Sequence, residues 1–156
     1  MPLEIERKYL VNSNIYKLEA RRSYKIIQGY LSSDSQRTVR VRIKENLAFL
    51  TIKGSSDQQG LSRYEWEREI PVCEAEELMK LCLPGIIEKT RFEIIYASHI
   101  FEVDEFYGEN DGLIVAEVEL ASISDIVELP LWIDREVTGD SRYYNASLID
   151  RPFGTW

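Results

Sequence analysis

The chain has 156 residues, the length of one ordinary domain, and 44% of them are hydrophobic. A domain of this size buries about 70% of the surface that its unfolded chain exposes, so we expect a packed core without disulfides, and the composition argues against disorder. The net charge of −8 disfavours nonspecific binding to nucleic acids or membranes, because such binding needs a basic surface.

Alternation of apolar and polar side chains predicts strands along most of the chain. The predicted strands are Leu3–Val11, Tyr24–Ser32, Thr38–Glu45, Leu47–Lys53, Ser62–Pro71, Ile86–Ala97, His99–Phe106 and Gly112–Ala121. Helices are predicted at Cys73–Cys82 and, shorter, at Ile15–Ala20, Ser122–Val127 and Arg142–Ile149. Eight strands with few helices favour a mainly β (α+β) fold, an antiparallel barrel or a sandwich, over alternating βαβ units. No linker or repeat is visible, so one domain over residues 1–156 is expected.

Several predicted strands carry rows of charge on one face, because residues i, i+2 and i+4 of a strand point to the same side. The acidic rows are Glu4 and Glu6; Glu65, Glu67 and Glu69; Glu102 and Asp104; and Glu117 and Glu119. The basic rows are Arg40, Arg42 and Lys44, and Lys89 and Arg91, with Lys8 and Lys53 on further strands. For any single strand, a solvated polar face is the simpler interpretation. Whole rows of one sign are less usual, since a solvent face normally pairs opposite charges across strands.

Carboxylate rows suit hard divalent cations, and Arg and Lys rows suit phosphate oxygens. An eight-stranded barrel can hold one small ligand in its interior. Charges turned inward would each cost several kcal/mol if unpaired, but a wet tunnel that holds cations and a polyanion removes most of this cost. The rows therefore favour a charged tunnel.

Short motifs follow one another in order along nearly the whole chain. They are Glu4-Ile5-Glu6-Arg7-Lys8, Gln28-Gly29-Tyr30, Arg40-Val41-Arg42, Thr51-Ile52-Lys53-Gly54, Glu65-Trp66-Glu67, Lys89-Thr90-Arg91, Glu102-Val103-Asp104, Glu117-Val118-Glu119, and Val137-Thr138-Gly139-Asp140 leading to Asn145. In this order they resemble the CYTH superfamily, also called triphosphate tunnel metalloenzymes. The resemblance implies an eight-stranded antiparallel β-barrel tunnel with a few helices packed outside, which binds a triphosphate and one or two Mg²⁺ or Mn²⁺ ions.

The first strand looks most like that of small bacterial members, which implies metal-dependent hydrolysis of inorganic triphosphate to pyrophosphate and phosphate. Two other enzymatic functions stay open: a class IV-type adenylate cyclase, and a nucleoside or thiamine triphosphatase. Both need a base- or thiazole-binding feature, and the sequence reveals none. A noncatalytic polyphosphate-binding module is a further alternative, although it could dispense with the carboxylate rows.

The sequence has no phosphate-binding P-loop, so side chains must hold the phosphates. The predicted phosphate ligands are Lys8, Arg40, Arg42, Lys53, Lys89 and Arg91. The predicted metal ligands are Glu4, Glu6, Glu65, Glu67, Asp104, Glu117 and Glu119, not all at once, because magnesium favours one or two carboxylates together with water and phosphate oxygens. In some relatives a tyrosine at the place of Tyr30 pairs with the signature lysine, which implies that Tyr30 and Lys8 cooperate in catalysis. A core tyrosine satisfied by one hydrogen bond is an equally good interpretation of Tyr30.

The remaining features predict the setting of the protein. The first nine residues are charged almost from the start, and no apolar run approaches the ~20 residues of a membrane helix. Cys73 and Cys82 fit neither a redox pair nor a zinc site, so a reduced, cytoplasmic protein is expected. We expect a small-molecule triphosphate as the partner, with no nucleic acid and no membrane, and a homodimer stays open.

Overall fold

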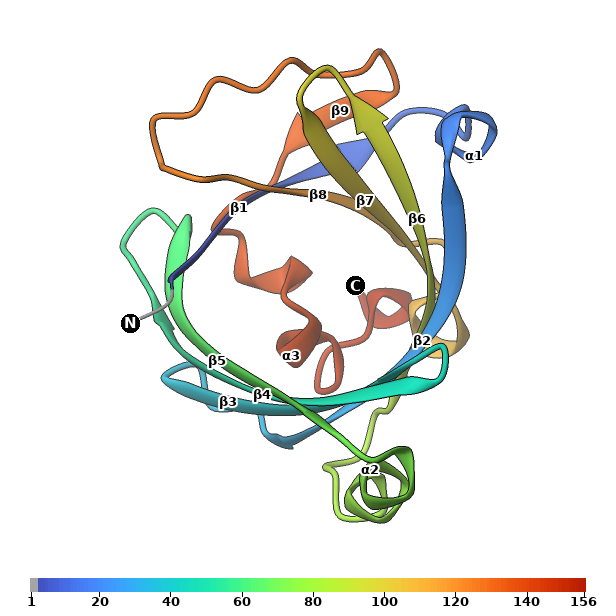
Figure 1. The fold of residues 1–156 in the computed structure, drawn as a ribbon, viewed down its shortest axis with the longest axis vertical. Helices are drawn as coiled ribbons and strands as arrows, with labels where there is room; N and C mark the ends of the chain where they lie inside the picture. The colour runs from blue at the N-terminus through green and yellow to red at the C-terminus, as the bar shows by residue number, and fades with distance from the viewer. Residues whose placement is uncertain (1–2) are drawn as a thin grey trace.

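The computed structural model describes residues 3–156, and in that range nine strands form one antiparallel sheet. The strands are β1 (Leu3–Val11), β2 (Arg22–Ser32), β3 (Arg37–Lys44), β4 (Leu47–Ser56), β5 (Ser62–Ile70), β6 (Ile87–Tyr96), β7 (His99–Phe106), β8 (Ile114–Glu119) and β9 (Ile133–Glu136). Their order is β5-β4-β3-β2-β6-β7-β8-β1, and pairing of β1 with β5 closes eight of them into a barrel (Figure 1). The prediction of a mainly β, eight-stranded antiparallel barrel is confirmed.

One predicted helix is wrong, and one strand was not predicted. Residues 122–127 form no helix; instead the Asp125 carboxylate accepts hydrogen bonds from the backbone N–H groups of Ala121 (2.9 Å) and Ser122 (3.4 Å), which fixes a turn. The sequence also gave no sign of β9, which pairs with the end of β1 through Tyr9 and Val11. Four residues are too few for alternation to stand out from the flanking segments.

Two of the three α-helices of the described residues lie outside the barrel and one does not. The helices are α1 (Tyr16–Glu19), α2 (Val72–Met79) and α3 (Asn145–Leu148), with 3₁₀ turns at Gly108–Asn110, Ser141–Tyr143 and Phe153–Thr155. In the view down the barrel, α1 and α2 lie beyond the strands, whereas α3 lies within their ring (Figure 1). The C-terminal segment therefore enters one end of the barrel.

Three apolar clusters hold these parts together. One covers the outside of β1, β7 and β8, where Tyr16 of α1 and Trp132 are buried with Phe101. A second lies between α2 and the outer face of β3 and β4. The third, the apolar plug, joins inward-facing strand residues to the C-terminal segment and includes Tyr30, Ile87, Phe106, Leu148 and Ile149. One end of the barrel interior is therefore filled with apolar side chains, and charge occupies the rest.

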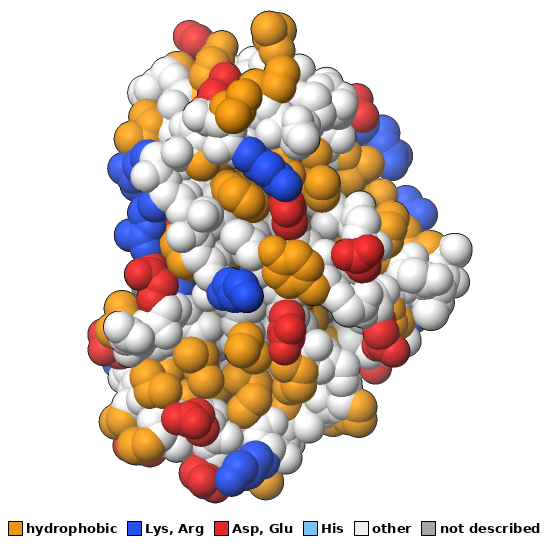
Figure 2. Space-filling view, turned by 90° about the vertical axis from the view of Figure 1, so that its right-hand side faces the viewer, with side chains coloured by type: hydrophobic (Ala, Val, Ile, Leu, Met, Phe, Trp, Pro, Cys, Tyr) orange, Lys and Arg blue, Asp and Glu red, His pale blue; other side chains and the backbone are white. Residues whose placement is uncertain are grey.

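The outer surface mixes apolar groups with single charged side chains (Figure 2). Toward the lower end of that view, at the level of α2, several apolar side chains lie close together on the surface. Leu81, Leu83 and Ile86, which follow α2, are among the exposed apolar residues. Over residues 3–156 no helix has both the length and the apolar character needed to cross a membrane.

Candidate active site

A cavity of about 550 Å³ lies inside the barrel, and every one of the eight barrel strands contributes a side chain to it. Alternation along each strand directs these side chains inward, while the intervening apolar residues pack outside. The predicted site residues that line the cavity are Glu4, Glu6, Lys8, Tyr30, Arg40, Arg42, Lys53, Glu65, Glu67, Lys89, Arg91, Glu117 and Glu119. Glu102 and Lys44 also line it. Thus the structure brings together nearly all of the predicted residues.

The charges divide the inner surface into two walls. Strands β7, β8, β1 and β5 are consecutive in the barrel and carry all of the lining carboxylates, so we call them the acidic wall. Strands β6, β2, β3 and β4 are also consecutive and carry most of the lining cations, so we call them the basic wall. Lys8 and Arg63 are the cations placed on the acidic wall.

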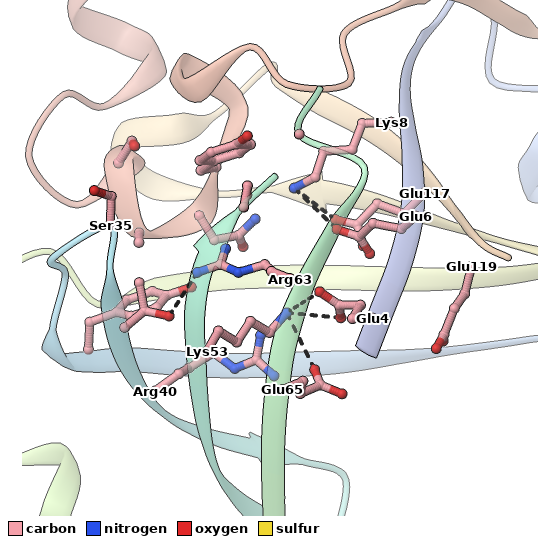
Figure 3. A pocket seen from close by; sticks show the side chains of 18 of the residues that line it. Glu4, Glu6, Lys8, Ser35, Arg40, Lys53, Arg63, Glu65, Glu117 and Glu119 are labelled. Carbon is pink, nitrogen blue, oxygen red and sulfur yellow. Dashed lines mark hydrogen bonds and ion pairs between the residues drawn. The ribbon is translucent and has the colours of Figure 1, made fainter. Parts of the chain in front are cut away.

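Two lysines lie among the carboxylates of the acidic wall (Figure 3). The Lys53 amine donates to both oxygens of Glu4 at 2.8 and 2.9 Å and lies 3.5 Å from Glu65. The Lys8 amine lies 3.6 Å from Glu117 and 3.7 Å from Glu6. Each lysine therefore forms ion pairs with two carboxylates. Because the carboxylates outnumber the lysines, the acidic wall keeps an excess of negative charge.

That excess changes the pKa values of the acidic wall. Burial raises the pKa of Glu6 to about 8, and the neighbouring carboxylates of Glu117 and Glu4 add to the effect. Burial also raises the pKa values of Glu65, Glu102 and Glu119 above their ordinary range. These four carboxylates lack sufficient positive charge around them.

Glu117 and Lys8 behave differently, because each has opposite charge beside it. Burial acts to raise the pKa of Glu117, but Lys8, Arg91 and Lys89 outweigh it and hold that pKa well below its usual range. Burial acts to lower the pKa of Lys8, but Glu117, Glu6 and Glu4, with Tyr30, raise it above the ordinary value. Lys8 is therefore a permanent cation at neutral pH. Its amine also lies 5.3 Å from the centre of the Tyr144 ring.

On the basic wall, the deepest cations share one carboxylate. Asp104 accepts hydrogen bonds from the Lys89 amine at 2.7 Å and from Nε and one terminal nitrogen of Arg91 at 2.8 and 2.9 Å. The Lys89 and Asp104 side chains are each 1% exposed. Asp104 does not line the cavity, and both of its oxygens are occupied. Its predicted role as a metal ligand stays a prediction, while its contacts make it the fixed partner of two cations.

The two arginines of β3 are paired less completely, because Arg40 has a single carboxylate, Glu67, 3.6 Å from a terminal nitrogen, and Arg42 has none in the described part of the chain. Arg42 has no ion pair with any carboxylate of residues 3–156, and its Nε donates to the side-chain oxygen of Gln28 at 2.8 Å. Burial, with Arg40 and Arg91 nearby, lowers the pKa of Arg42 to about 9. Arg40 is 8% exposed; one terminal nitrogen donates to Thr51 at 3.2 Å, and its Nε is buried without a partner. Both guanidinium groups thus have donors available for an anion.

Four residues of the site were not predicted from the sequence: Arg63, Tyr144 and Asn145, which line the cavity, and Gln28, which is wholly buried and bonds to Arg42 and Asn145. Strand parity could have found two of them, because Gln28 shares a face with Tyr30 and Arg63 shares one with Glu65. No strand pattern could predict where the side chains of Tyr144 and Asn145 point, because these residues lie beyond the barrel strands, at the start of the short helix α3. Tyr30 lies between the apolar plug and the cavity, and its pairing with Lys8 stays a prediction.

The carboxylates fit a metal that is shared with a ligand. Among residues 3–156, no three side chains of Asp, Glu, His or Cys converge closely enough to hold an ion by themselves. Magnesium needs only one or two carboxylates when water and phosphate oxygens complete its shell. The under-neutralised carboxylates of Glu6, Glu102 and Glu119 have the right chemistry for such an ion.

The geometry defines a class of protein: a small closed barrel whose interior is a binding cavity with opposed acidic and basic walls. The chain belongs to the CYTH family, because the CYTH domain profile matches residues 2–153. The resemblance seen in the motifs is therefore confirmed.

Named relatives span almost the full chain. The inorganic triphosphatase of Acetivibrio thermocellus is 44% identical over 154 residues, which cover 98% of this chain and 97% of that protein. The inorganic triphosphatase of Nitrosomonas europaea is 34% identical over 93% of this chain and 95% of that protein. The crystal structure of the inorganic triphosphatase NE1496 superimposes with a TM-score of 0.65 at 32% identity, covering 94% of this chain and 97% of that one.

Proposed function

We propose that this chain hydrolyses inorganic triphosphate to pyrophosphate and phosphate with the help of Mg²⁺ or Mn²⁺. The observation that carries the proposal is the pair of opposed walls around one cavity. Arg42 has no carboxylate partner among residues 3–156, and Arg40 has only Glu67, 3.6 Å away, with its Nε unpaired, while the acidic wall has too little positive charge around Glu6 and its neighbours. A triphosphate with one or two divalent cations supplies both. The names of the two relatives above support the same choice of substrate.

The basic wall would bind the phosphates. Arginine can donate two parallel hydrogen bonds to phosphate oxygens, whereas lysine acts as a point charge. Arg40 and Arg42 have the free donors for such forked contacts, and Lys89 and Arg91 add charge beside them. Lys8 reaches the same cavity from the acidic wall, and Lys53 extends from β4 of the basic wall to the carboxylate of Glu4. Because phosphoryl transfer depends mainly on position and charge, these residues would hold the terminal phosphate in line for attack.

The acidic wall would hold the metal. The proposed ligands are Glu4, Glu6, Glu65, Glu67, Glu117 and Glu119, with Asp104 as a further candidate. When bound, a divalent ion supplies positive charge to the phosphate oxygens as negative charge develops on them. Glu4 and Glu6 would also orient the attacking water by accepting its hydrogen bonds.

Lys8 would stabilise charge rather than remove a proton, because its raised pKa keeps it protonated at neutral pH. Tyr30 lies on the same inner surface and contributes to that raised pKa. We propose that the two residues cooperate in catalysis, by stabilising negative charge on the terminal phosphate or on the pyrophosphate that leaves. We also propose a cytoplasmic setting, which suits the free Cys73 and Cys82.

The test compares phosphate release from triphosphate, pyrophosphate, ATP and thiamine triphosphate, each with Mg²⁺ or Mn²⁺. Fast turnover of inorganic triphosphate alone supports the proposal. Formation of cyclic AMP from ATP, or preferred turnover of ATP or thiamine triphosphate, replaces it with one of the other enzymatic functions. Tight binding of triphosphate without turnover of any substrate identifies a binding module instead.

A further inference from the structure

One side chain of the C-terminal segment reaches into the basic wall. The side-chain oxygen of Asn145, at the start of α3, accepts hydrogen bonds from the Lys89 amine at 2.9 Å and from the Gln28 amide nitrogen at 2.8 Å. The oxygen of Gln28 accepts in turn from Nε of Arg42 at 2.8 Å. A chain of two amides therefore links α3 to cations on two different strands, β6 and β3.

This chain restricts both cations and leaves donors unused. Lysine has three N–H donors, and Lys89 uses two of them, on Asp104 and Asn145. Arginine has five, and Arg42 uses its Nε–H on Gln28. Gln28 is wholly buried, and hydrogen bonds at both the oxygen and the nitrogen of its amide fix its orientation. The remaining donors of Lys89 and Arg42, both of which line the cavity, are held in place for a ligand.

The acceptors that Asn145 and Gln28 offer are neutral. A carboxylate would orient the same cations, but it would also cancel positive charge, of which Asp104 with its one negative charge already offsets part for the pair Arg91 and Lys89. An amide oxygen accepts the hydrogen bond and leaves the positive charge available to the ligand. Arg42 illustrates the result, because it is buried beside Arg40 and Arg91 and lacks a carboxylate partner among residues 3–156.

We propose that Asn145 and Gln28 are positioning residues that orient Lys89 and Arg42 toward the phosphates without neutralising them. The proposal rests on the proposed function, since it assumes that the phosphates bind at the basic wall. It makes the C-terminal segment part of the substrate site and not only a plug for the barrel. A purely structural role would predict that only the stability of the protein depends on Asn145.

The experiment measures kcat, KM and the thermal midpoint for three variants, Asn145→Ala, Asn145→Asp and Gln28→Ala. Asn14→Ala is the matched control, because Asn14 is exposed and outside the cavity. At a temperature where every variant is folded, Asn145→Ala should lower kcat/KM for triphosphate by about tenfold or more, as expected when a hydrogen bond to a charged group is lost. The kcat/KM of Asn14→Ala for triphosphate should stay within about twofold of the wild-type value.

Asn145→Asp separates orientation from charge. It keeps the acceptor oxygen and the shape of the side chain, so a purely structural role predicts nearly unchanged kinetics. The proposed role predicts a loss at least as large as that of Asn145→Ala, seen mainly as a higher KM, because a second carboxylate would cancel the positive charge that Asp104, shared between Lys89 and Arg91, leaves in place, and would repel phosphate. Unchanged kinetics in both Asn145 variants would overturn the proposal.

A double-mutant cycle tests whether Gln28 acts by orienting Arg42. It also tests the proposal if Asn145→Ala does not fold. Gln28→Ala alone should lower kcat/KM by about tenfold. In an Arg42→Ala background the same change should have less than about a twofold effect, because Gln28 acts through Arg42. Equal effects in both backgrounds would refute that role of Gln28. If the unchanged protein turns over no triphosphate, the proposed function fails, and calorimetric affinity for triphosphate with Mg²⁺ then gives the same comparison among the variants.

Discussion

The two walls of the barrel solve the problem of buried charge in different ways. On the basic wall, Lys89 and Arg91 share the single negative charge of Asp104, and Arg42 is held by the neutral amide of Gln28. On the acidic wall, carboxylates outnumber the two lysines that serve them, so the pKa of Glu6 is raised to about 8. The acidic wall therefore depends on added cations more than the basic wall depends on added anions.

The difference explains why opposite charges on facing walls do not simply cancel. Full pairing across the cavity would stabilise the barrel but leave nothing for a ligand. Instead the excess of each sign is kept on a rigid sheet, where the pairing of neighbouring strands fixes the distance between side chains. Substrate and metal would complete the electrostatics of the folded protein.

Removal of divalent metal should have the largest effect on activity. Without cations the acidic wall repels the phosphates, and the developing charge is not stabilised. Triphosphate turnover measured in EDTA should fall by about a thousandfold or more and should return when Mg²⁺ or Mn²⁺ is added in excess. Full turnover by a protein that has been stripped of metal would contradict the proposed role of the carboxylates.

Glu6→Gln should separate activity from stability. It removes a proposed metal ligand, so turnover with Mg²⁺ should fall by about a hundredfold. At neutral pH it also removes a carboxylate whose raised pKa shows that its charged form is unfavourable in the metal-free fold. The thermal midpoint of the metal-free protein should therefore rise or stay unchanged. A clear drop of that midpoint would show that Glu6 is a stabilising ion-pair partner.

Asp104→Asn removes the β7 carboxylate that pairs with cations of the basic wall, and it should have the opposite effect on stability. The carboxyl pKa of Asp104 is held below its usual value, against burial, by Arg91 and Lys89. Its loss leaves the buried Lys89 without a carboxylate partner and Arg91 with only Glu102, 3.4 Å away, which should lower the free energy of unfolding by about 3 kcal/mol and the thermal midpoint by roughly 6–12 °C. If Asp104→Asn and Glu6→Gln shift the midpoint equally, the distinction between the walls is wrong.

Glu69→Gln should have the smallest effect. Glu69 shares its face of β5 with Glu65 and Glu67, but it is exposed and does not line the cavity. Turnover and thermal midpoint should both stay within the range of ordinary surface changes, about twofold in rate and 0.5 kcal/mol in stability. A loss comparable to that predicted for Glu6→Gln would extend the acidic wall beyond the cavity.

The period of two predicted the strands and most of the cavity lining, whereas the choice of a barrel over a sandwich came from the resemblance to the CYTH superfamily. Once Glu4, Glu6 and Lys8 lie on one face, closing the sheet must turn them inward or outward together. The same logic includes Asp104, but parity does not show depth, and only the fold places its carboxylate between Lys89 and Arg91.

The parts that the sequence did not predict depend on contacts between distant segments. Asn145 meets Gln28 across 117 positions of the chain, and no periodicity links a short C-terminal helix to the inside of a barrel. The strand Ile133–Glu136 and the turn at Asp125 were missed for a related reason, because each is short and is defined by its hydrogen bonds.

The most direct test is a crystal structure with triphosphate and Mn²⁺, recorded at the manganese absorption edge. Anomalous peaks should lie against the acidic wall, within coordination distance of carboxylates such as Glu6, Glu117 or Glu119, with phosphate oxygens between the metal and Arg40 and Arg42. Manganese or triphosphate bound outside the barrel, with an unoccupied cavity, would contradict the assignment of the two walls.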